Sequence, residues 1–402
     1  HLHVIIFSTY RSYSLFMFLK IQKNIQLVFF ISLLLPAAHS YAEGEIKIPA
    51  PPRLAASSYF LQDFDSGRIL AERNADVVLP PASLTKIMTV YIAFRELSNN
   101  RLSLDDMVTI SEKAWRTPGS KMFIEVNKQV KVEDLLKGII IQSGNDASVA
   151  IAEHIAGDEY TFAELMNQQA QRLGMHSTHF MNATGLPVPD QHYTTARDLA
   201  ILTRAVIKEF PEYYRWDSVK EFSYNNITQQ NRNILLWRDE SVDGVKTGHT
   251  EEAGYCLIAS AKREQMRLIS VVLGTKSKSA RANESQTLLN YGFRFYDTHK
   301  LYEANTELTT ARVWKGASDT VSLGVGEDLY VTISRRHYTE MKAATSVDVK
   351  IMAPVKQGDQ LGVVNVTLRD ETVRSMPLVA LNTVEKGSFL QRTYDAALML
   401  IK

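Results

Sequence analysis

The sequence is poor in cysteine and has no excess of charge of either sign. Cys256 is the only cysteine among 402 residues, so the chain can form no internal disulfide and no metal cluster held by several thiolates. Lys and Arg total 45 and Asp and Glu total 44, a net charge of +1, which excludes a strongly basic nucleic-acid-binding protein. The ten histidines contain no His-Glu-x-x-His pair, the motif of many zinc peptidases. We therefore expect no metal, no cofactor and no nucleic-acid partner.

A run of apolar residues long enough to cross a membrane is also missing near the start of the chain. Residues 27–35 read LVFFISLLL, which is nine residues, whereas a membrane-spanning helix needs about 20. Two lysines precede this run, and small residues follow it up to Ala42, the pattern of a secretory signal peptide. We predict cleavage after Ala42, with Met17 as the natural start and residues 1–16 as upstream sequence. The alternative is an uncleaved N-terminal membrane anchor.

The rest of the chain divides by its hydrophobic patterns. Apolar residues make up 45% and charged residues 22%, as in a globular protein, and the length favours two to three domains. We expect strands over 58–64 and 68–71, a mostly helical stretch over 84–207, a hairpin of 254–261 with 266–274, and a helix over 288–296. Short strands recur after residue 297 and predict a small all-β domain. The tail from 388 to 402 has one apolar helix face.

The first motif with chemical meaning is SLTK, residues 83–86. Two prolines precede it and an apolar helical stripe follows, so Ser83 is expected in the first turn of a buried helix, with Lys86 one turn away on the same face. A serine hydroxyl is a weak nucleophile until a base takes its proton, and a desolvated lysine can be that base. A helix-capping serine beside a solvated lysine is the simpler alternative for this motif taken alone.

Two further motifs follow in the chain. Ser143-Gly-Asn145 lies on an expected loop after an apolar run, where plain turn chemistry is the alternative. Lys246-Thr-Gly248 lies on an expected strand, where Gly248 lets a ligand approach the backbone closely. Each motif is weak alone. The ordered set of S-x-x-K, S-x-N and K-T-G is the signature of penicillin-binding proteins and class A β-lactamases.

The sequence resembles the low-molecular-mass penicillin-binding proteins, which are serine-type D-alanyl-D-alanine carboxypeptidases. The resemblance runs from about Ser58 through the tail. It is carried by PASLTK (81–86), QSGNDA (142–147), QNRN (230–233), VDGVKTGHT (242–250) and MRLISVVLG (266–274). It implies an α+β fold: a β-lactamase/transpeptidase-like catalytic domain with an antiparallel sheet and a helical cluster, then a small all-β sandwich domain and an amphipathic C-terminal helix. We divide the chain into 1–42, 43–296, 297–385 and 386–402 accordingly.

The resemblance also implies a role for each motif residue. Ser83 attacks the carbonyl between the two terminal D-alanines of a peptidoglycan pentapeptide, and Lys86 takes its proton. Ser143 and Lys246 pass a proton to the leaving amine. The remaining expected residues bind the substrate. Asn145 holds its amide, the backbone N–H groups of Ser83 and His249 its oxyanion, and Thr247 and Arg232 its terminal carboxylate. Gly248 lets its backbone approach the strand, and Asp198 matches a family aspartate near the site. For Asp198, an ordinary aspartate at a helix N-terminus is the alternative.

The expected partners and location follow from the same resemblance. β-Lactam antibiotics acylate Ser83, and the tail makes peripheral contact with the outer face of the bacterial inner membrane, which places the protein in the periplasm. An ordinary helix packed on the β-domain is the alternative for the tail. Residues 115–122 look shorter than in well-known relatives, and Ala147 stands where some relatives carry a cysteine.

Three other functions remain open at this point. A serine β-lactamase shares the three motifs, but a class A enzyme also needs a glutamate for deacylation. The one candidate E-x-x-N motif runs from Glu164 to Asn167. It lies within a predicted helix, and we expect Glu164 at the surface. A D,D-endopeptidase or a noncatalytic penicillin-binding scaffold would also fit parts of the sequence, although the complete set of two lysines and two serines argues against the scaffold.

Overall fold

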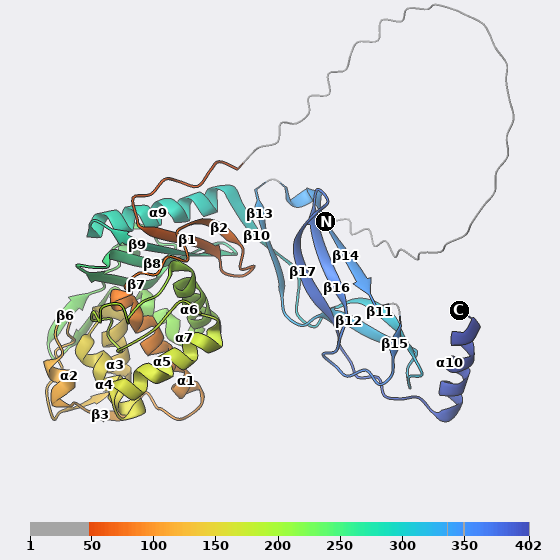
Figure 1. The fold of residues 1–402 in the computed structure, drawn as a ribbon, viewed down its shortest axis with the longest axis horizontal. Coiled ribbons are helices and arrows are strands. Elements are labelled where there is room, and N and C mark those ends of the chain that lie inside the picture. Colours follow the sequence, from red (N-terminus) through yellow and green to blue (C-terminus); the bar gives the residue numbers. More distant parts are fainter. Residues whose placement is uncertain (1–47, 336, 349, 402) are drawn as a thin grey trace, which may run out of the picture.

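The structure is a computed structural model that describes residues 48–335, 337–348 and 350–401. The predicted signal peptide, its start at Met17 and its cleavage site lie outside the described residues. The described chain is elongated: a larger α+β domain lies at one end, a smaller β-domain follows, and helix α10 lies at the far end (Figure 1).

The α+β domain is built on a five-stranded antiparallel sheet with the order β2-β1-β9-β8-β7. These strands are β1 (Ser58–Asp63), β2 (Ile69–Arg73), β7 (Val242–Thr250), β8 (Gly254–Arg263) and β9 (Met266–Thr275). The predicted strand pair near the start and the predicted hairpin are both confirmed. Strand β7, which carries the Lys246 motif, is an edge strand, so one of its sides is open to the active-site region.

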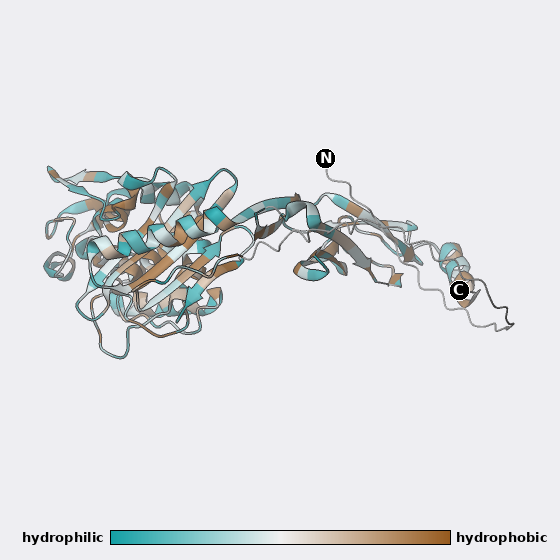
Figure 2. Ribbon diagram, turned by 90° about the horizontal axis from the view of Figure 1, so that it is seen from above, coloured by the Kyte–Doolittle hydropathy of each residue, from teal (hydrophilic) through white to brown (hydrophobic). Residues whose placement is uncertain are grey.

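Both faces of this sheet are covered because apolar residues occupy both sets of alternating positions. Phe60 and Ile258 belong to the core beneath the helical cluster, whereas Leu61 and Leu257 belong to the core beneath helix α9. Figure 2 shows hydrophobic residues along the strands in the middle of this domain. The sheet is therefore a buried layer between helices, as the α+β prediction requires.

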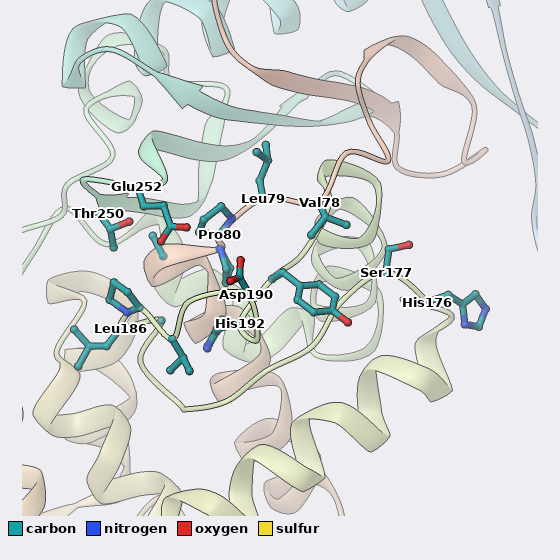
Figure 3. A pocket seen from close by; sticks show the side chains of 16 residues that line it. Val78, Leu79, Pro80, His176, Ser177, Leu186, Asp190, His192, Thr250 and Glu252 are labelled. Carbon is teal, nitrogen blue, oxygen red and sulfur yellow. The ribbon is translucent and has the colours of Figure 1, made fainter.

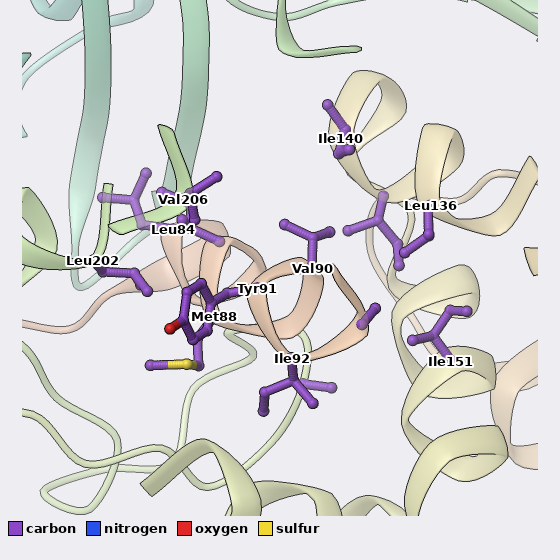
Figure 4. Packing of buried hydrophobic residues seen from close by; sticks show 14 of the residues in the cluster. Leu84, Met88, Val90, Tyr91, Ile92, Leu136, Ile140, Ile151, Leu202 and Val206 are labelled. Carbon is purple, nitrogen blue, oxygen red and sulfur yellow. The ribbon is translucent and has the colours of Figure 1, made fainter. Parts of the chain in front are cut away.

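Helix α1 (Lys86–Ser98) forms the centre of the helical cluster. Ten of its thirteen residues are buried, and Leu84, Met88 and Tyr91 pack among side chains from the surrounding elements (Figure 4). The other helices of this domain are α2 (Glu112–Arg116), α3 (Val132–Lys137), α4 (Asn145–Ala156), α5 (Glu159–Leu173), α6 (Ala196–Glu209), α7 (Pro211–Tyr214) and α8 (Leu235–Arg238). The stretch predicted as mostly helical also contains a small hairpin of β3 (Met107–Thr109) and β4 (Gln129–Lys131), and a second hairpin follows it, β5 (Glu221–Tyr224) with β6 (Ile227–Gln230).

The helix predicted over 288–296 is longer than expected. Helix α9 runs over Lys278–Phe295, and Ser277 caps it by accepting a hydrogen bond of 3.0 Å from the backbone N–H of Ala280. The first turns are rich in polar residues, so the apolar periodicity that marks the second half is absent there. The error matters because the added turns carry a residue of the active-site cleft, described below.

The prediction of an all-β domain after residue 297 is confirmed. Strands β10 (Tyr296–Tyr302) and β13 (Leu329–Ser334) form one sheet, and the other has the order β14-β16-β17-β12-β11-β15. Its strands are β11 (Glu307–Trp314), β12 (Thr320–Val325), β14 (Met341–Val347), β15 (Ile351–Met352), β16 (Gln360–Leu368) and β17 (Glu371–Ala380). Val331 and Ile333 of the small sheet share a core with Val364 and Leu378 of the large one, which joins the two sheets.

Helix α10 (Phe389–Ile401) is attached to the β-domain by one buried residue. Asp395 is 6% exposed and lies 3.3 Å from the Arg312 guanidinium, and its carboxylate also accepts the backbone N–H of Lys315. Leu390 and Tyr394, by contrast, are largely exposed. None of the helices within the described ranges combines the length and the hydropathy of a membrane-spanning segment.

Candidate active site

The three sequence motifs converge on a cleft of about 800 Å³ beside the open side of β7. Ser83 comes from a 3₁₀ turn (Ala82–Thr85) that leads into α1, and Ser143 from the loop before α4. Thr247, Gly248 and His249 come from β7. The cleft is also lined by Gly119, Ser120, Gln230, Asn231, Arg232, Ile234, Tyr255, Lys278 and Arg281.

Ser83 and Lys86 form a nucleophile and base pair by geometry. The Nζ atom of Lys86 lies 3.1 Å from Ser83 Oγ and 2.5 Å from the backbone carbonyl of Thr184. Lys86 is only 1% exposed, and burial, assisted by the nearby Arg232 charge, lowers its pKa from 10.5 to about 7. A lysine with this pKa is substantially neutral at pH 7, so its lone pair can accept the serine proton.

The turn that carries Ser83 is held by a close backbone contact. Ala82 has a φ of +46°, and a Cβ on Gly185 would lie 1.8 Å from the Ala82 carbonyl oxygen, so only glycine fits there. Asn182 supports this loop, because its Oδ1 accepts hydrogen bonds from the backbone N–H groups of Thr184 and Gly185. The loop that orients Lys86 is thus locked against the nucleophile turn.

Ser143 and Lys246 form a second pair. Lys246 Nζ donates to Ser143 Oγ over 2.8 Å and to the Thr247 carbonyl over 3.1 Å. Ser143 has a φ of +62°, between a turn of π-helix at Gly138–Gln142 and α4, which directs its side chain differently from a helical residue. Burial and the charges of Lys86, Arg232 and Arg281 lower the pKa of Lys246 well below its usual range.

Asn145 is engaged within the protein, and its contact with the substrate stays a prediction. Its Nδ2 donates a hydrogen bond of 2.6 Å to the Pro118 carbonyl, and its buried Oδ1 has no partner among the described residues. Next to it, the Asp146 carboxylate accepts the backbone N–H groups of Met122, Phe123 and Ile124 at 2.8, 2.9 and 3.3 Å. These two residues hold the loop over 117–124, which forms one wall of the cleft.

Two arginines make the cleft cationic. Arg232 donates from Nη1 to Ser120 Oγ over 2.6 Å, and burial lowers its pKa. Arg281, which the sequence prediction missed, lies in the first turns of α9 and donates to the Gly248 carbonyl over 3.1 Å. Burial lowers the pKa of Arg281 to about 10, so it stays charged at neutral pH. No local sequence signal marks it, because a contact across 33 residues brings it to the cleft.

Asp198 is not among the residues that line the cleft. It lies in the first turn of α6, where its carboxylate accepts from the Ser177 backbone N–H and the Thr178 hydroxyl at 2.9 and 2.7 Å. Burial raises its pKa. Asp198 thus ties the loop before it to α6, as expected of a helix N-terminal aspartate, and its role in substrate binding stays a prediction.

A second hollow, of about 490 Å³, is lined in part by the residues that directly precede Ser83 (Figure 3). Pro81, Ala82 and Leu186 line it, together with His192, whose Nε2 lies 2.8 Å from the Thr85 hydroxyl. Burial lowers the pKa of His192 to about 4, so the ring is uncharged at neutral pH. The contact between His192 and Thr85 helps to hold the turn that carries Ser83 in place.

Three other predictions concern residues away from the reacting groups. Cys256 is buried in β8, and burial raises the pKa of its thiol to about 11, so it is packed rather than reactive, as expected. Glu164 is exposed on α5, as predicted for a surface residue. Among the residues that the structure describes, no group of three or more His, Cys, Asp or Glu side chains is placed to hold a metal ion.

Comparison with known proteins agrees with this geometry. Residues 45–277 match the model of the peptidase S11 family, D-alanyl-D-alanine carboxypeptidase, and residues 296–386 match the C-terminal domain of penicillin-binding protein 5. The chain is 43% identical to D-alanyl-D-alanine carboxypeptidase DacC of Escherichia coli (strain K12), over 92% of this chain and 93% of that protein.

Solved structures agree as well. Penicillin binding protein 5 from Haemophilus influenzae is 42% identical, with a TM-score of 0.80 over 84% of this chain and all of that one. Penicillin-binding protein D2 from Listeria monocytogenes, solved in its ampicillin-bound form, is 32% identical, with a TM-score of 0.57 over 61% of this chain and all of that one. The chain belongs to the peptidase S11 family of serine-type D-alanyl-D-alanine carboxypeptidases.

Proposed function

We propose that this protein is a D,D-carboxypeptidase of the bacterial cell wall, which removes the terminal D-alanine from peptidoglycan pentapeptide stems through an acyl-enzyme on Ser83. The observation that carries the proposal is the hydrogen bond between Lys86 Nζ and Ser83 Oγ, with a second lysine–serine pair on the same cleft. Family membership supplies the substrate class.

Catalysis divides between the two pairs. Lys86, neutral because it is buried, takes the Ser83 proton as Oγ attacks the peptide carbonyl between the two D-alanines. The backbone N–H groups of Ser83 and His249 stabilise the oxyanion, and such a donor is typically worth about 3 kcal/mol. Lys246, through Ser143, delivers a proton to the departing amine. Water then attacks the acyl-enzyme and loses a proton to Lys246 through Ser143, while Lys86 returns its proton to Ser83 Oγ, so that both lysines regain their starting states.

The position of the cations explains why the reaction is confined to a chain terminus. Arg232 and Thr247 both line the cleft and are proposed to bind the carboxylate of the terminal D-alanine, for which a guanidinium fork is well shaped. Arg281 adds a second positive charge there. Gly248 leaves room for the turn that carries Ser83, since a Cβ at this position would lie 3.2 Å from Leu84 Cγ.

Asn145 can join the substrate only after a change at the cleft wall. Its amide nitrogen is engaged with Pro118, so a bound peptide amide would have to displace that bond or use the unpartnered Oδ1. We therefore assign Asn145 first to the wall of the cleft and second to substrate binding.

β-Lactam binding follows from the same residues. A β-lactam presents an acyl carbonyl and a carboxylate in the arrangement of the D-alanyl-D-alanine terminus, and the Listeria relative was solved with ampicillin bound. The β-lactamase alternative is not favoured, because Glu164 is exposed on α5 and its partner in the motif, Asn167, is bonded to the backbone of Phe180.

The experiment that tests the proposal has two parts. A peptide that ends in D-alanyl-D-alanine is incubated with the protein, and released D-alanine is measured; endopeptidase activity is assayed in parallel on cross-linked dimers. Benzylpenicillin is then added, and the acyl-enzyme is detected and its decay followed by mass spectrometry. Release of D-alanine with a slowly decaying adduct is expected. Hydrolysis of penicillin at hundreds of turnovers per second would replace the proposal with a β-lactamase.

The location is also a proposal. A predicted signal peptide over residues 17–42 and the exposed apolar side chains of α10 support a periplasmic protein that contacts the outer face of the inner membrane through its tail. The proposed domains are a catalytic domain over 43–296, a β-domain over 297–385 and a tail over 386–402. The end of the second family match at residue 386 supports the last boundary.

A further inference from the structure

The segment QNRN over 230–233 contributes one residue, Arg232, to the proposed function and leaves its two asparagines without a role. Asn231 and Asn233 are both buried, on either side of the exposed Arg232. A buried amide is costly unless its polar atoms are hydrogen-bonded. The partners of these two amides therefore show what the segment is attached to.

Asn231 attaches the segment to the chain that directly precedes β5. Its backbone N–H donates to the Lys220 carbonyl over 2.7 Å, and its Nδ2 donates to the Val219 carbonyl over 3.1 Å. Its Oδ1 accepts the backbone N–H of Asn233 at 3.0 Å. Arg232 is thus the middle residue of a turn that an asparagine side chain closes.

Asn233 attaches the other end of the segment to the strand that carries Lys246. Its Nδ2 donates to the Gly244 carbonyl of β7 over 2.9 Å, and its Oδ1 accepts the backbone N–H of Leu235 at 3.2 Å. Gly244 is itself closely packed, since a Cβ there would lie 2.6 Å from the Tyr214 hydroxyl oxygen. β7 is also paired with β8. The strand is therefore a fixed frame to which the segment is tied.

The arginine between these two anchors needs a fixed backbone. Its guanidinium donates from Nη1 to Ser120 Oγ over 2.6 Å, at the wall of the cleft. An arginine side chain has many rotamers, so one contact at its tip does not determine where the whole guanidinium lies. Asn233 is 1% exposed and is not among the residues that line the cleft. Any influence of Asn233 on the substrate therefore passes through other residues, and Arg232 is its direct neighbour.

We propose that Asn233 is a positioning residue for the carboxylate site: its hydrogen bond to Gly244 holds Arg232 in place beside β7. The inference rests on the proposed function, in which Arg232 and Thr247 of β7 bind the terminal carboxylate of the substrate. A carboxylate that is held by two groups needs them in one fixed arrangement. Loss of the Asn233 bond frees the segment from β7 and weakens the contact between Arg232 and the carboxylate.

The test is a comparison of kcat and KM for D-alanine release from a peptide that ends in D-alanyl-D-alanine, with the full chain. Asn233→Ser loses the bond to Gly244 and keeps a hydroxyl for the backbone N–H of Leu235, whereas Asn233→Ala loses both bonds. In each variant KM is expected to rise about tenfold with kcat changed by less than about twofold, since displacements near 1 Å can cost up to about a hundredfold. Active enzyme is counted by titration with a fluorescent penicillin, and folding is checked by thermal unfolding. Either variant suffices if the other does not fold.

A double variant separates positioning from a merely structural role. Arg232→Gln alone should raise KM, and adding Asn233→Ser should raise it no further, because the group that Asn233 positions is already gone. A structural asparagine would lower the unfolding temperature in both backgrounds and leave KM unchanged. Asn167→Ser is the matched control, because Asn167 also donates to a backbone carbonyl and accepts a backbone N–H, both of Phe180, at 2.9 and 2.8 Å. Its KM should equal that of the parent.

Three results overturn the inference. The first is a KM that stays at the parent value in the folded Asn233 variants. The second is a further rise of KM when Asn233→Ser is added to Arg232→Gln, and the third is an equal rise in Asn167→Ser. A parent protein that releases no D-alanine and forms no penicillin adduct would instead refute the proposed function.

Discussion

The Nζ atom of Lys86 lies 3.1 Å from Ser83 Oγ and 2.5 Å from the carbonyl oxygen of Thr184. One contact connects the base to the nucleophile, and the other holds the base in place by an acceptor that cannot itself take a proton. Because Lys86 is 1% exposed, water does not compete for either contact. The fold therefore sets the position of the proposed base beside the proposed nucleophile before substrate binds.

Replacing Ser83 by alanine should abolish the reaction. We expect Ser83→Ala to lower D-alanine release by a factor on the order of 10⁴–10⁶ and to prevent formation of a penicillin adduct, because Ser83 carries the hydroxyl that is hydrogen-bonded to Lys86. Mass spectrometry after incubation with benzylpenicillin is the measurement. Ser177→Ala, on the wall of the second hollow, is the control and should be labelled like the parent. An adduct on the Ser83 variant would show that another residue is the nucleophile.

Activity should depend on pH through Lys86. Burial lowers the pKa of this lysine to about 7, and only its neutral form accepts the Ser83 proton. Above pH 7 Lys86 is therefore mainly unprotonated and can accept the proton, whereas below pH 7 the acylation rate falls about tenfold for each pH unit. Rates of labelling by penicillin between pH 5 and 8 test this. A midpoint near pH 10, the ordinary value for lysine, would mean that Lys86 is not desolvated in solution.

The contact of Gly185 with Ala82 should tolerate no side chain. A Cβ at position 185 would lie 1.8 Å from a backbone oxygen in the turn that carries Ser83, so Gly185→Ala must displace either the turn or the loop that orients Lys86. We expect acylation to fall at least about a hundredfold, as displacements near 1 Å can cost. Gly157→Ala is the matched control, because Gly157 also has a positive φ, +85°, but has no atom within 4 Å of its Cβ position.

The control should lose only about 1–2 kcal/mol of stability, from the left-handed backbone, and should keep the parent acylation rate. Both variants are compared by thermal unfolding and by penicillin labelling. Equal acylation by both would show that the contact between the two loops does not position the nucleophile.

The sequence alone was sufficient to predict the candidate reacting groups, but not the residues that surround them. Ser83 with Lys86, and Lys246 with its neighbours, lie within short motifs whose local structure is decided by a helix start and a strand, so spacing predicted them. Thr184 and Arg281 are brought to the site by a loop and a helix that are distant from the motifs in the sequence. The residues next to them form no motif that would mark them as part of the site. Asn145 belongs to the second motif, but its hydrogen bond to Pro118 depends on how a neighbouring loop folds back, which no motif records.

Arg281 should contribute to substrate binding rather than to the chemical step. Arg281→Gln removes a positive charge from the cleft, and the loss of a charge-assisted bond to the terminal carboxylate is worth about 1.5–3 kcal/mol, or about 10- to 150-fold in kcat/KM. Most of the loss should lie in KM, since the carboxylate is bound equally before and during acylation. Arg294→Gln, an exposed residue on the same helix, is the control. A fall in kcat with KM unchanged would place Arg281 among the groups that act on the transition state.

The tail should bind membranes through side chains that the fold leaves outside. Asp395 fixes one side of α10 to the β-domain, while Leu390 and Tyr394 are 79% and 67% exposed, so their apolar surface can enter an interface without unfolding anything. Burial of such side chains contributes about 25 cal/mol per Å². In a flotation assay, the full chain is expected to float with vesicles of phosphatidylethanolamine and phosphatidylglycerol. A chain that lacks 388–402 is expected to remain in the unbound fraction. The double variant Leu390→Ser with Tyr394→Ser should also stay behind, because it keeps the helix charge and loses the apolar surface.

Thr393→Ser, an exposed position between those two residues, is the matched control and should float like the parent. The contact of Asp395 with the Lys315 backbone gives a second comparison, because Asp395→Asn weakens the attachment to the β-domain and leaves every apolar side chain of the tail in place. If the helix binds membranes by its exposed face alone, this variant floats as the parent does. If the tail is instead an ordinary packed helix, the deleted chain and the double variant float no differently from the parent, and Asp395→Asn lowers only the thermal stability of the β-domain.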